Sequence, residues 1–265
     1  MSLQSNGLTN IGMGEGFTTN FQVRYETSLF DSLPPAQKAT VKANLIANCN
    51  ALLGVVENEF TVTTGWFNTP SGKFGTGHRQ VVNLNETDGS GANNSGYGSN
   101  INQDAQSGNN NAADAAGRVE MLFENEWVEI LMALSSGKWN AGNSSGEGLS
   151  QILGILRFPT GHYSYYTEGG PRHFTEIWMN TVPRQDWVNK TEGTDGNMVS
   201  FGCALGFLFY LNTQLSFTIN QIIAAGDSTL AATYKTLTGD TGDPFPFFAS
   251  LLEHVYPSSG GLRPD

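Results

Sequence analysis

The sequence predicts an α+β protein, with a small N-terminal β-sheet that carries one helix and a C-terminal half that is mostly helical. Two observations predict this class. Segments of alternating apolar residues and β-branched or aromatic runs fall before residue 86, whereas apolar residues at three- and four-residue steps dominate after residue 111. Strands gathered early and helices gathered late are typical of α+β domains and not of alternating β-α-β units.

The N-terminal part contains the predicted sheet. Residues 1–20 have no periodic pattern and are expected to form a flexible lead-in. Residues 20–29 are predicted to form a strand, because Phe21, Val23 and Tyr25 alternate there. A helix is expected after the proline pair, since helical spacing links Val41, Leu45, Ile46, Cys49, Leu52 and Leu53. Residues 60–67 ("FTVTTGWF") and 77–84 ("GHRQVVNL") are predicted as two further strands.

Residues 86–111 form the low-complexity segment of the chain, which is rich in Gly, Asn and Ser. They contain too few apolar residues to build a core, so we expect a loop, either a mobile insertion or an ordered loop over a cleft. Helical spacing then predicts helices at 112–135, 146–157, 171–180, 198–213, 216–225, 227–237 and 245–254. There is no internal repeat, and residues 21–265 are expected to form a single domain.

Charge and composition limit the function classes. The net charge of −11, from 13 Lys+Arg and 24 Asp+Glu, argues against nucleic acids and anionic membrane surfaces as partners. No apolar run approaches the roughly 20 residues of a membrane span. Charged residues are only 14% and Gly is abundant, a composition typical of secreted and surface proteins, although the first 17 residues predict no signal peptide. Cys49 and Cys203 are expected to be buried free thiols, with a disulfide as the alternative.

Glu126 falls within the apolar stripe of the helix predicted over residues 112–135. On a helical wheel this stripe passes through Val119, Leu122, Phe123, Ile130 and Leu134. Asn125 and Glu129 flank it, four residues apart and therefore on one side of the helix. A carboxylate in such a stripe is costly unless it is paired or hydrogen-bonded, and burial raises its pKa. Glu126 is therefore either a functional carboxyl group or a structural one that caps backbone groups or meets an arginine.

The spacing around Glu126 matches an HExxH zinc-peptidase helix, in which two imidazoles one turn apart accompany a glutamate general base. Here the five positions read Asn125-Glu126-Trp127-Val128-Glu129. The base position is kept, whereas both histidine positions have changed. Glu147 follows near the start of the next predicted helix, which Ser144 or Ser145 can cap.

Three segments of the chain resemble a known protein family. The segment "WNAGNSSGEGLSQIL" is similar to the second helix of gluzincin peptidases, especially the basic-secretory-protein-like group. The segment "DGNMVSFGCALGFLFYLNTQLSFTINQIIAAG" resembles the helix that follows a short linker in that group, and "ATYKTLTGDTGDPFPFFASLLE" resembles its closing helical pair. The resemblance covers roughly residues 110–255. It implies a zincin-like fold in which Glu126 matches the general base, Glu147 matches the third metal ligand, and Asn125 and Glu129 match the two histidines.

These departures from the family pattern change the expected metal chemistry. Neutral imidazoles suit zinc, whereas an all-oxygen set of Asn125, Glu129 and Glu147 suits Ca²⁺, Mg²⁺ or Mn²⁺. We therefore expect either no cofactor or an oxygen-ligated divalent cation, and not zinc. None of the four histidines pairs at a metal-ligand spacing.

The loop after the second helix adds a candidate binding surface. His162, Tyr163, Tyr165 and Tyr166 lie within "GHYSYY", and a peptide or glycan ligand is expected to meet them if the loop folds over Glu126. Core aromatic residues and a surface histidine are the alternative interpretation.

Three functions are consistent with these features. The leading hypothesis is a secreted or cell-surface, zincin-like binding or structural protein without zinc-peptidase activity. The second is a hydrolase that uses Glu126 as general acid or base, with a non-zinc metal or a distant histidine. The third is a self-assembling extracellular subunit. The sequence determines neither the oligomeric state nor the ligand.

Overall fold

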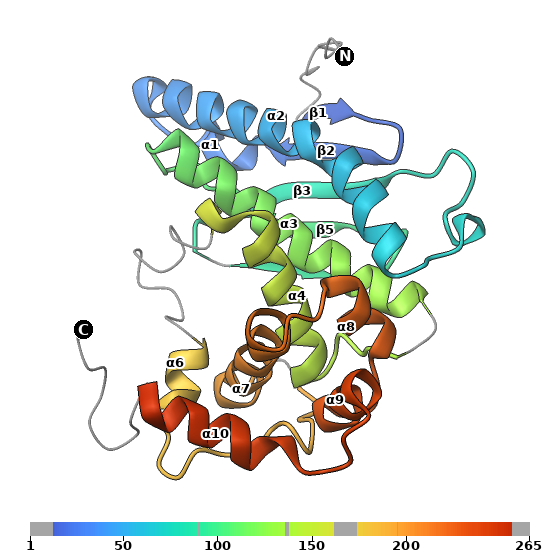
Figure 1. Cartoon of the computed structure of the whole chain (residues 1–265). Coiled ribbons are helices and arrows are strands. Elements are labelled where there is room, and N and C mark those ends of the chain that lie inside the picture. Colours follow the sequence, from blue (N-terminus) through green and yellow to red (C-terminus); the bar gives the residue numbers. More distant parts are fainter. Residues whose placement is uncertain (1–12, 90, 136–137, 162–173, 195, 256–265) are drawn as a thin grey trace. The chain divides into compact units, whose positions relative to one another are not determined.

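The computed structural model describes residues 13–89, 91–135, 138–161, 174–194 and 196–255 (Figure 1). It confirms the α+β class, with one five-stranded sheet and a larger helical part. The chain divides into two compact units, which we describe separately. Unit 1 comprises residues 1–65, 70–130 and 154–170, and unit 2 comprises residues 66–69, 131–153 and 171–265. The single domain expected over residues 21–265 stays a prediction.

The sheet of unit 1 has the strand order β1-β2-β3-β5-β4. The strands are β1 (Met13–Phe17), β2 (Phe21–Glu26), β3 (Gln80–Glu86), β4 (Ala92–Asn94) and β5 (Ile101–Asp104). The three central strands β2, β3 and β5 run parallel, and the two edge strands pair antiparallel. The sheet is therefore mixed, and β4 forms one of its edges.

Three of these strands differ from the expectations. β1 lies inside the predicted lead-in, and β4 and β5 lie inside the segment predicted to be a loop. The reason is that glycine and polar residues fill β-positions here, and several of the polar side chains make hydrogen bonds within unit 1. Buried Gln103, for example, donates its side-chain amide to the Val119 carbonyl at 2.9 Å.

The strand predicted over residues 60–67 is wrong. Residues 60–66 belong to the long helix α2 (Pro35–Trp66) instead. The short helix α1 (Ser28–Asp31) precedes α2, and the 3₁₀-helix η1 (Ser71–Lys73) follows it. The hydroxyls of Thr61, Thr63 and Thr64 each donate to the carbonyl four residues earlier. These bonds satisfy the hydroxyls within the helix, and Phe60 and Thr63 also contact Trp127 of α3, so tertiary packing outweighs the strand propensity of this segment.

By length and composition alone, α2 could cross a membrane, which differs from the sequence expectation of no span. Only 28% of its most apolar window is buried. A core helix of a soluble protein passes the same test. α2 also buries polar Asn48, Glu59 and Thr63, and each of these makes a hydrogen bond within unit 1. The finding is therefore weak evidence for a membrane span.

The core of unit 1 lies between the sheet and two long helices, α2 and the first part of α3 (Ala112–Leu134), which run beside it in Figure 1. Trp127 is fully buried against the rings of Phe21, Phe60 and Phe74. Gly16 of β1 lies so close to α2 that an added Cβ would be 2.4 Å from Leu53. These contacts fix the face of α3 that carries Glu126.

The later helices confirm the predicted helices, with shifted ends. They are α4 (Ser144–Arg157), α6 (Phe174–Met179), α7 (Met198–Phe209), α8 (Ile219–Ala225), α9 (Leu230–Thr238) and α10 (Pro244–Val255). A π-helical turn, η2 (Tyr210–Gln214), follows α7 directly. In the core of unit 2 the Trp178 ring stacks on Phe248 with the centroids 5.4 Å apart. Cys49 and Cys203 are both buried free thiols, as predicted.

Candidate functional site

Glu126 is buried in α3, as the helical wheel predicts. Its exposed fraction is 8%, and burial raises its pKa to about 7. One hydrogen bond opposes this shift, because the Asn94 side-chain amide donates to Glu126 Oε2 at 2.8 Å. Burial therefore shifts the pKa of this carboxyl group toward neutral pH, which suits a general acid or base.

Asn94 holds two carboxyl groups together. Its Nδ2 also donates to Glu129 Oε2 at 3.0 Å, and its Oδ1 accepts from the Gly96 backbone at 2.9 Å. Asn94 is the last residue of edge strand β4, so this amide fixes the edge of the sheet against the Glu126 face of α3. Sequence reasoning missed Asn94, because it lies in a segment where asparagine is so common that no single one stands out.

Asn125 marks a close approach of two helices. Its side chain is buried, and a Cβ added to Gly154 of α4 would lie only 2.0 Å from Asn125 Oδ1. The glycine therefore lets α4 pack directly against Asn125. An asparagine fits this space because its side chain is compact and polar.

The remaining predicted site residues either lie elsewhere in the fold or fall outside the described residues. Glu147 lies in the first turn of α4, in unit 2, with a half-buried side chain. His162, Tyr163, Tyr165 and Tyr166 lie outside the described residues, as does His173. Among the described residues, no group of three or more His, Cys, Asp or Glu is arranged to hold a metal ion. Metal binding by Asn125, Glu129 and Glu147 stays a prediction.

A second set of acidic residues lies on α3, and sequence reasoning did not single it out. Glu124 is fully buried, and Glu120 is half-buried one turn earlier. Burial raises the pKa of both groups, to about 7 for Glu120 and well above the ordinary range for Glu124, and nearby Glu59 raises both further. The signal that could have revealed them is the pair of acids four residues apart beside an apolar stripe.

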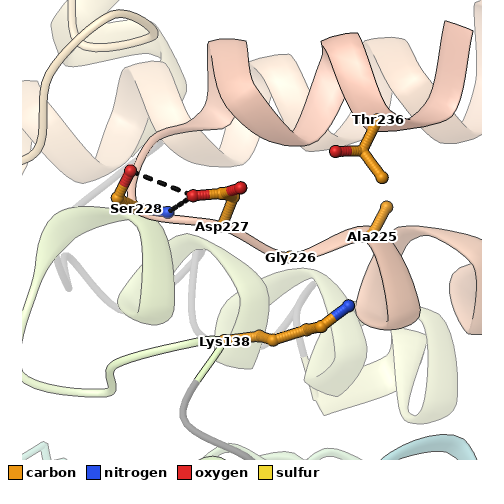
Figure 2. Close-up of a pocket in the computed structure, with 6 residues that line it drawn as sticks. All are labelled: Lys138, Ala225, Gly226, Asp227, Ser228 and Thr236. Atoms are coloured by element: carbon orange, nitrogen blue, oxygen red, sulfur yellow. Dashed lines mark hydrogen bonds between the residues drawn. The ribbon is translucent and has the colours of Figure 1, made fainter. Parts of the chain in front are cut away.

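Unit 2 contains a pocket of about 400 Å³, shown in Figure 2. Lys138, Asp227, Ser228 and Thr236 supply its polar lining. Ser228 donates its backbone and hydroxyl to Asp227 and lowers the pKa of that carboxyl group. Lys138 donates to the Ala224 carbonyl. One cation and one anion line the pocket, so its charge selects neither sign of ligand, and we assign it no function.

Comparisons with protein-family models, with curated proteins and with solved structures found no match to this chain. The zincin-like resemblance therefore rests on the sequence segments given above. What the structure adds is local geometry. Glu126 and Glu129 lie together, held by one amide of an edge strand.

Proposed function

We propose that this chain is a zincin-like secreted or cell-surface protein that binds an extended peptide beside Glu126 and has no zinc-peptidase activity. The observation that carries the proposal is the contact of Asn94, on edge strand β4, with both Glu126 and Glu129. It brings the last strand of the sheet, which has no further strand beyond it among the described residues, and two carboxyl groups to the same place. The mixed sheet and helical C-terminal half are coarse features that the family resemblance also implies.

The edge of β4 offers backbone groups to a partner strand. β4 ends the strand order and pairs with β5, and the Gly91 carbonyl accepts from the Asp104 amide at 2.7 Å. Because hydrogen-bonded and non-bonded pairs alternate in an antiparallel ladder, the backbone groups of Ala92 and Asn94 point to the open edge. An extended peptide can add to such an edge as a further strand. Glu126 and Glu129 then select among peptides by charge.

The residues at the family's ligand positions do not fit zinc. Zinc sites in proteins are built from imidazole and thiolate ligands with few carboxylates. Asn125 and Glu129 supply oxygen atoms instead, and Asn125 is packed against Gly154. We therefore derive no catalytic step through a metal ion.

Peptide binding can be tested at the β4 edge. Linear decapeptides selected by display on the purified chain should bind with affinities measurable by fluorescence anisotropy. Ala92→Pro removes an edge N–H and should weaken binding by tenfold or more, on the order of the loss of a hydrogen-bonded strand contact. Alternate N-methylation of the selected peptide should have a similar effect.

The matched control is Asn93→Ala, because the Asn93 backbone pairs with β5 and its side chain lies on the other face of the sheet. Its affinity for the selected peptide should lie within about twofold of the wild-type affinity, a smaller change than the loss of one hydrogen bond causes. Equal affinity for the Ala92→Pro variant and wild type would refute edge addition. A large assembly in light scattering, with no selectable peptide, would favour the self-assembling subunit instead.

A second candidate function, a hydrolase, is favoured by the raised pKa of Glu126 alone. A general base must be ionised, so its activity would rise as the pH increases through about 7, whereas activity dependent on a general acid would fall over the same range. Peptide and glycoside substrate panels assayed from pH 5.5 to 8.5 test this.

The variant Glu126→Gln separates the two functions. It should abolish any hydrolysis but keep peptide addition to the β4 edge, since glutamine retains an oxygen that can accept from Asn94, and only the discrimination by charge should weaken. Its thermal midpoint should lie closest to that of wild type at about pH 4.5 and exceed it clearly at pH 8.5. The reason is that a carboxyl group whose folded pKa is raised loses stability as the pH rises through that pKa. A variant that unfolds readily at both pH values would show that the carboxyl group is structural.

A further inference from the structure

A second pocket, of about 360 Å³, lies in unit 1 between the first turns of α2 and the loop that follows β5. Its volume lies within the range of small-molecule sites in proteins. Residues 33–44 form one wall, and residues 107–110 form the other. The chemistry of these two walls determines which ligand fits.

The loop wall is held in place by side chains from outside the loop. Asn44 of α2 donates its side-chain amide to the carbonyls of Ser107 and Asn109, at 3.0 and 3.2 Å. The Asp88 carboxylate accepts from the backbone amides of Ser107 and Gly108, both at 2.7 Å. The wall is therefore formed before a ligand arrives, which lowers the entropic cost of binding.

Gln106 shows how firmly the surrounding contacts determine the loop conformation. Its φ of 48° lies in the left-handed region, where a residue other than glycine is strained. The residue is buried, and its backbone N–H and side-chain amide both donate to Asp104 Oδ1, at 2.9 and 3.0 Å. Asn48 of α2 donates to the Gln106 carbonyl at 3.3 Å. Backbone strain persists only where such contacts enforce it, and strained residues gather at ligand sites.

The pocket contains amide side chains whose hydrogen-bonding capacity the described residues do not use. Gln37 and Asn110 are exposed, and neither side chain has a hydrogen-bond partner in the part of the chain that the structure describes. Asn44 makes both of its side-chain bonds through Nδ2, so its Oδ1 remains an acceptor. The Thr40 hydroxyl donates to the Ala36 carbonyl at 3.3 Å, and its oxygen can still accept. The pocket therefore offers both donors and acceptors to a ligand.

The rest of the described lining is uncharged. Lys38 and Lys42 of α2 are not among the described lining residues, and Lys38 pairs with Asp31 at 3.0 Å. Leu33 and Val41 are half-buried and supply apolar surface. A charged ligand would find no counter-ion among these groups, whereas hydroxyl groups and an apolar C–H face match them.

We propose that this pocket binds a small neutral ligand with several hydroxyl groups, either a sugar ring or a cyclic polyol. The amides of Gln37, Asn44 and Asn110 exchange hydrogen bonds with the hydroxyl groups. Leu33 and Val41 contact the C–H face of the ligand. This inference does not depend on the proposed peptide binding, because none of the described lining residues belongs to β4 or α3.

NMR titration of the ¹⁵N-labelled chain tests the proposal through its side-chain amide signals. The probes are methyl α-glucoside, methyl β-galactoside and myo-inositol. At least one probe should shift the signals of Gln37, Asn44 and Asn110 saturably, with a Kd of about 1–50 mM, as expected for a few net hydrogen bonds. Tighter binding of a glycoside would identify the ligand as a sugar ring, and tighter binding of myo-inositol would identify it as a cyclic polyol.

The variant Gln37→Ala should raise the Kd about threefold to tenfold, the effect of losing one hydrogen bond. The matched control is Asn50→Ala, because Asn50 is another exposed amide of α2 and is not among the described lining residues. It should leave the Kd unchanged. Ala36→Trp fills the pocket from an exposed position and should remove binding, while circular dichroism checks that the variant folds.

Three results would overturn the proposal. The first is the absence of a saturable shift with all of the probes. The second is an equal change of Kd in Gln37→Ala and Asn50→Ala. The third is tighter binding of glucuronate or glucose 6-phosphate than of the neutral glucoside, because a charged ligand would then be preferred.

Discussion

Replacing Asp104 with alanine should cost about 3–5 kcal/mol in the free energy of unfolding, the loss expected when one partner of a buried ion pair is removed. Asp104 ends strand β5, is fully buried and forms an ion pair with Arg118 of α3. Its oxygens accept from the Gly89 backbone at 2.6 Å, from the Gln106 backbone at 2.9 Å, and from both Nε and Nη2 of Arg118 at 3.2 Å. Alanine would leave these donors, one of them a buried cation, without this acceptor.

Urea unfolding followed by circular dichroism measures the loss. The matched control is Asp88→Ala, because exposed Asp88 also accepts from two loop amides, those of Ser107 and Gly108. Water can replace an exposed acceptor, so this change should cost no more than about 1 kcal/mol. The double variant Asp104→Ala/Arg118→Met should recover part of the Asp104→Ala loss. If Asp104→Ala and Asp88→Ala lower the free energy of unfolding equally, then burial of the ion pair does not determine the loss.

The predictable part of the fold is the part with strong apolar periodicity. Helices after residue 111 follow from three- and four-residue spacing, and the structure shifts their ends by a few residues only. The same reasoning placed Glu126 in a buried stripe, which its 8% exposure confirms. Apolar spacing suffices to place these helices, but it does not give the extent of their burial, because residues 121–128 of α3 are buried on every side.

The parts that sequence reasoning missed depend on contacts between distant residues. β5 carries the polar sequence "INQD", and only its pairing with β3 and the Gln103 bond to α3 make it a central strand. Residues 60–66 look like a strand, yet they continue α2, where Phe60 and Thr63 contact Trp127 of α3. No local window contains this information.

The candidate site also has features that the sequence predicts and features that depend on distant residues. The spacing of Glu126 and Glu129 indicates their common helix, but the amide that joins them comes from Asn94, 32 residues earlier in the chain than Glu126. Glu124 was overlooked because a helical wheel places it outside the apolar stripe, yet its side chain is completely buried in the folded chain. Tertiary neighbours therefore determine which carboxyl groups of α3 are buried.

Trp127→Ala should lower the free energy of unfolding by about 3–5 kcal/mol, the range for removing a large buried aromatic side chain. Trp127 is fully buried, with the ring centroids of Phe21 and Phe60 at 5.2 and 5.7 Å. Its indole Nε1 also donates to Thr63 Oγ1 at 3.0 Å. Alanine would create a cavity at the point where strand β2 meets α2 and α3, and it would remove this link between the two helices.

The variant Trp127→Phe separates the two contributions, because it keeps a ring in the cluster and removes the indole N–H. It should cost about 1–3 kcal/mol, and guanidinium unfolding followed by circular dichroism measures both changes. The control is Trp187→Ala in unit 2, where the ring is only half-buried beneath Lys190 and should contribute about 1 kcal/mol or less. Losses equal to that control would contradict the assignment of Trp127 to the core. Trp127 adjoins Glu126 in the chain, so the Trp127→Phe variant also tests what sets the pKa of Glu126. If this variant folds and keeps the pH response of Glu126, then burial and the Asn94 hydrogen bond set that pKa and the indole does not.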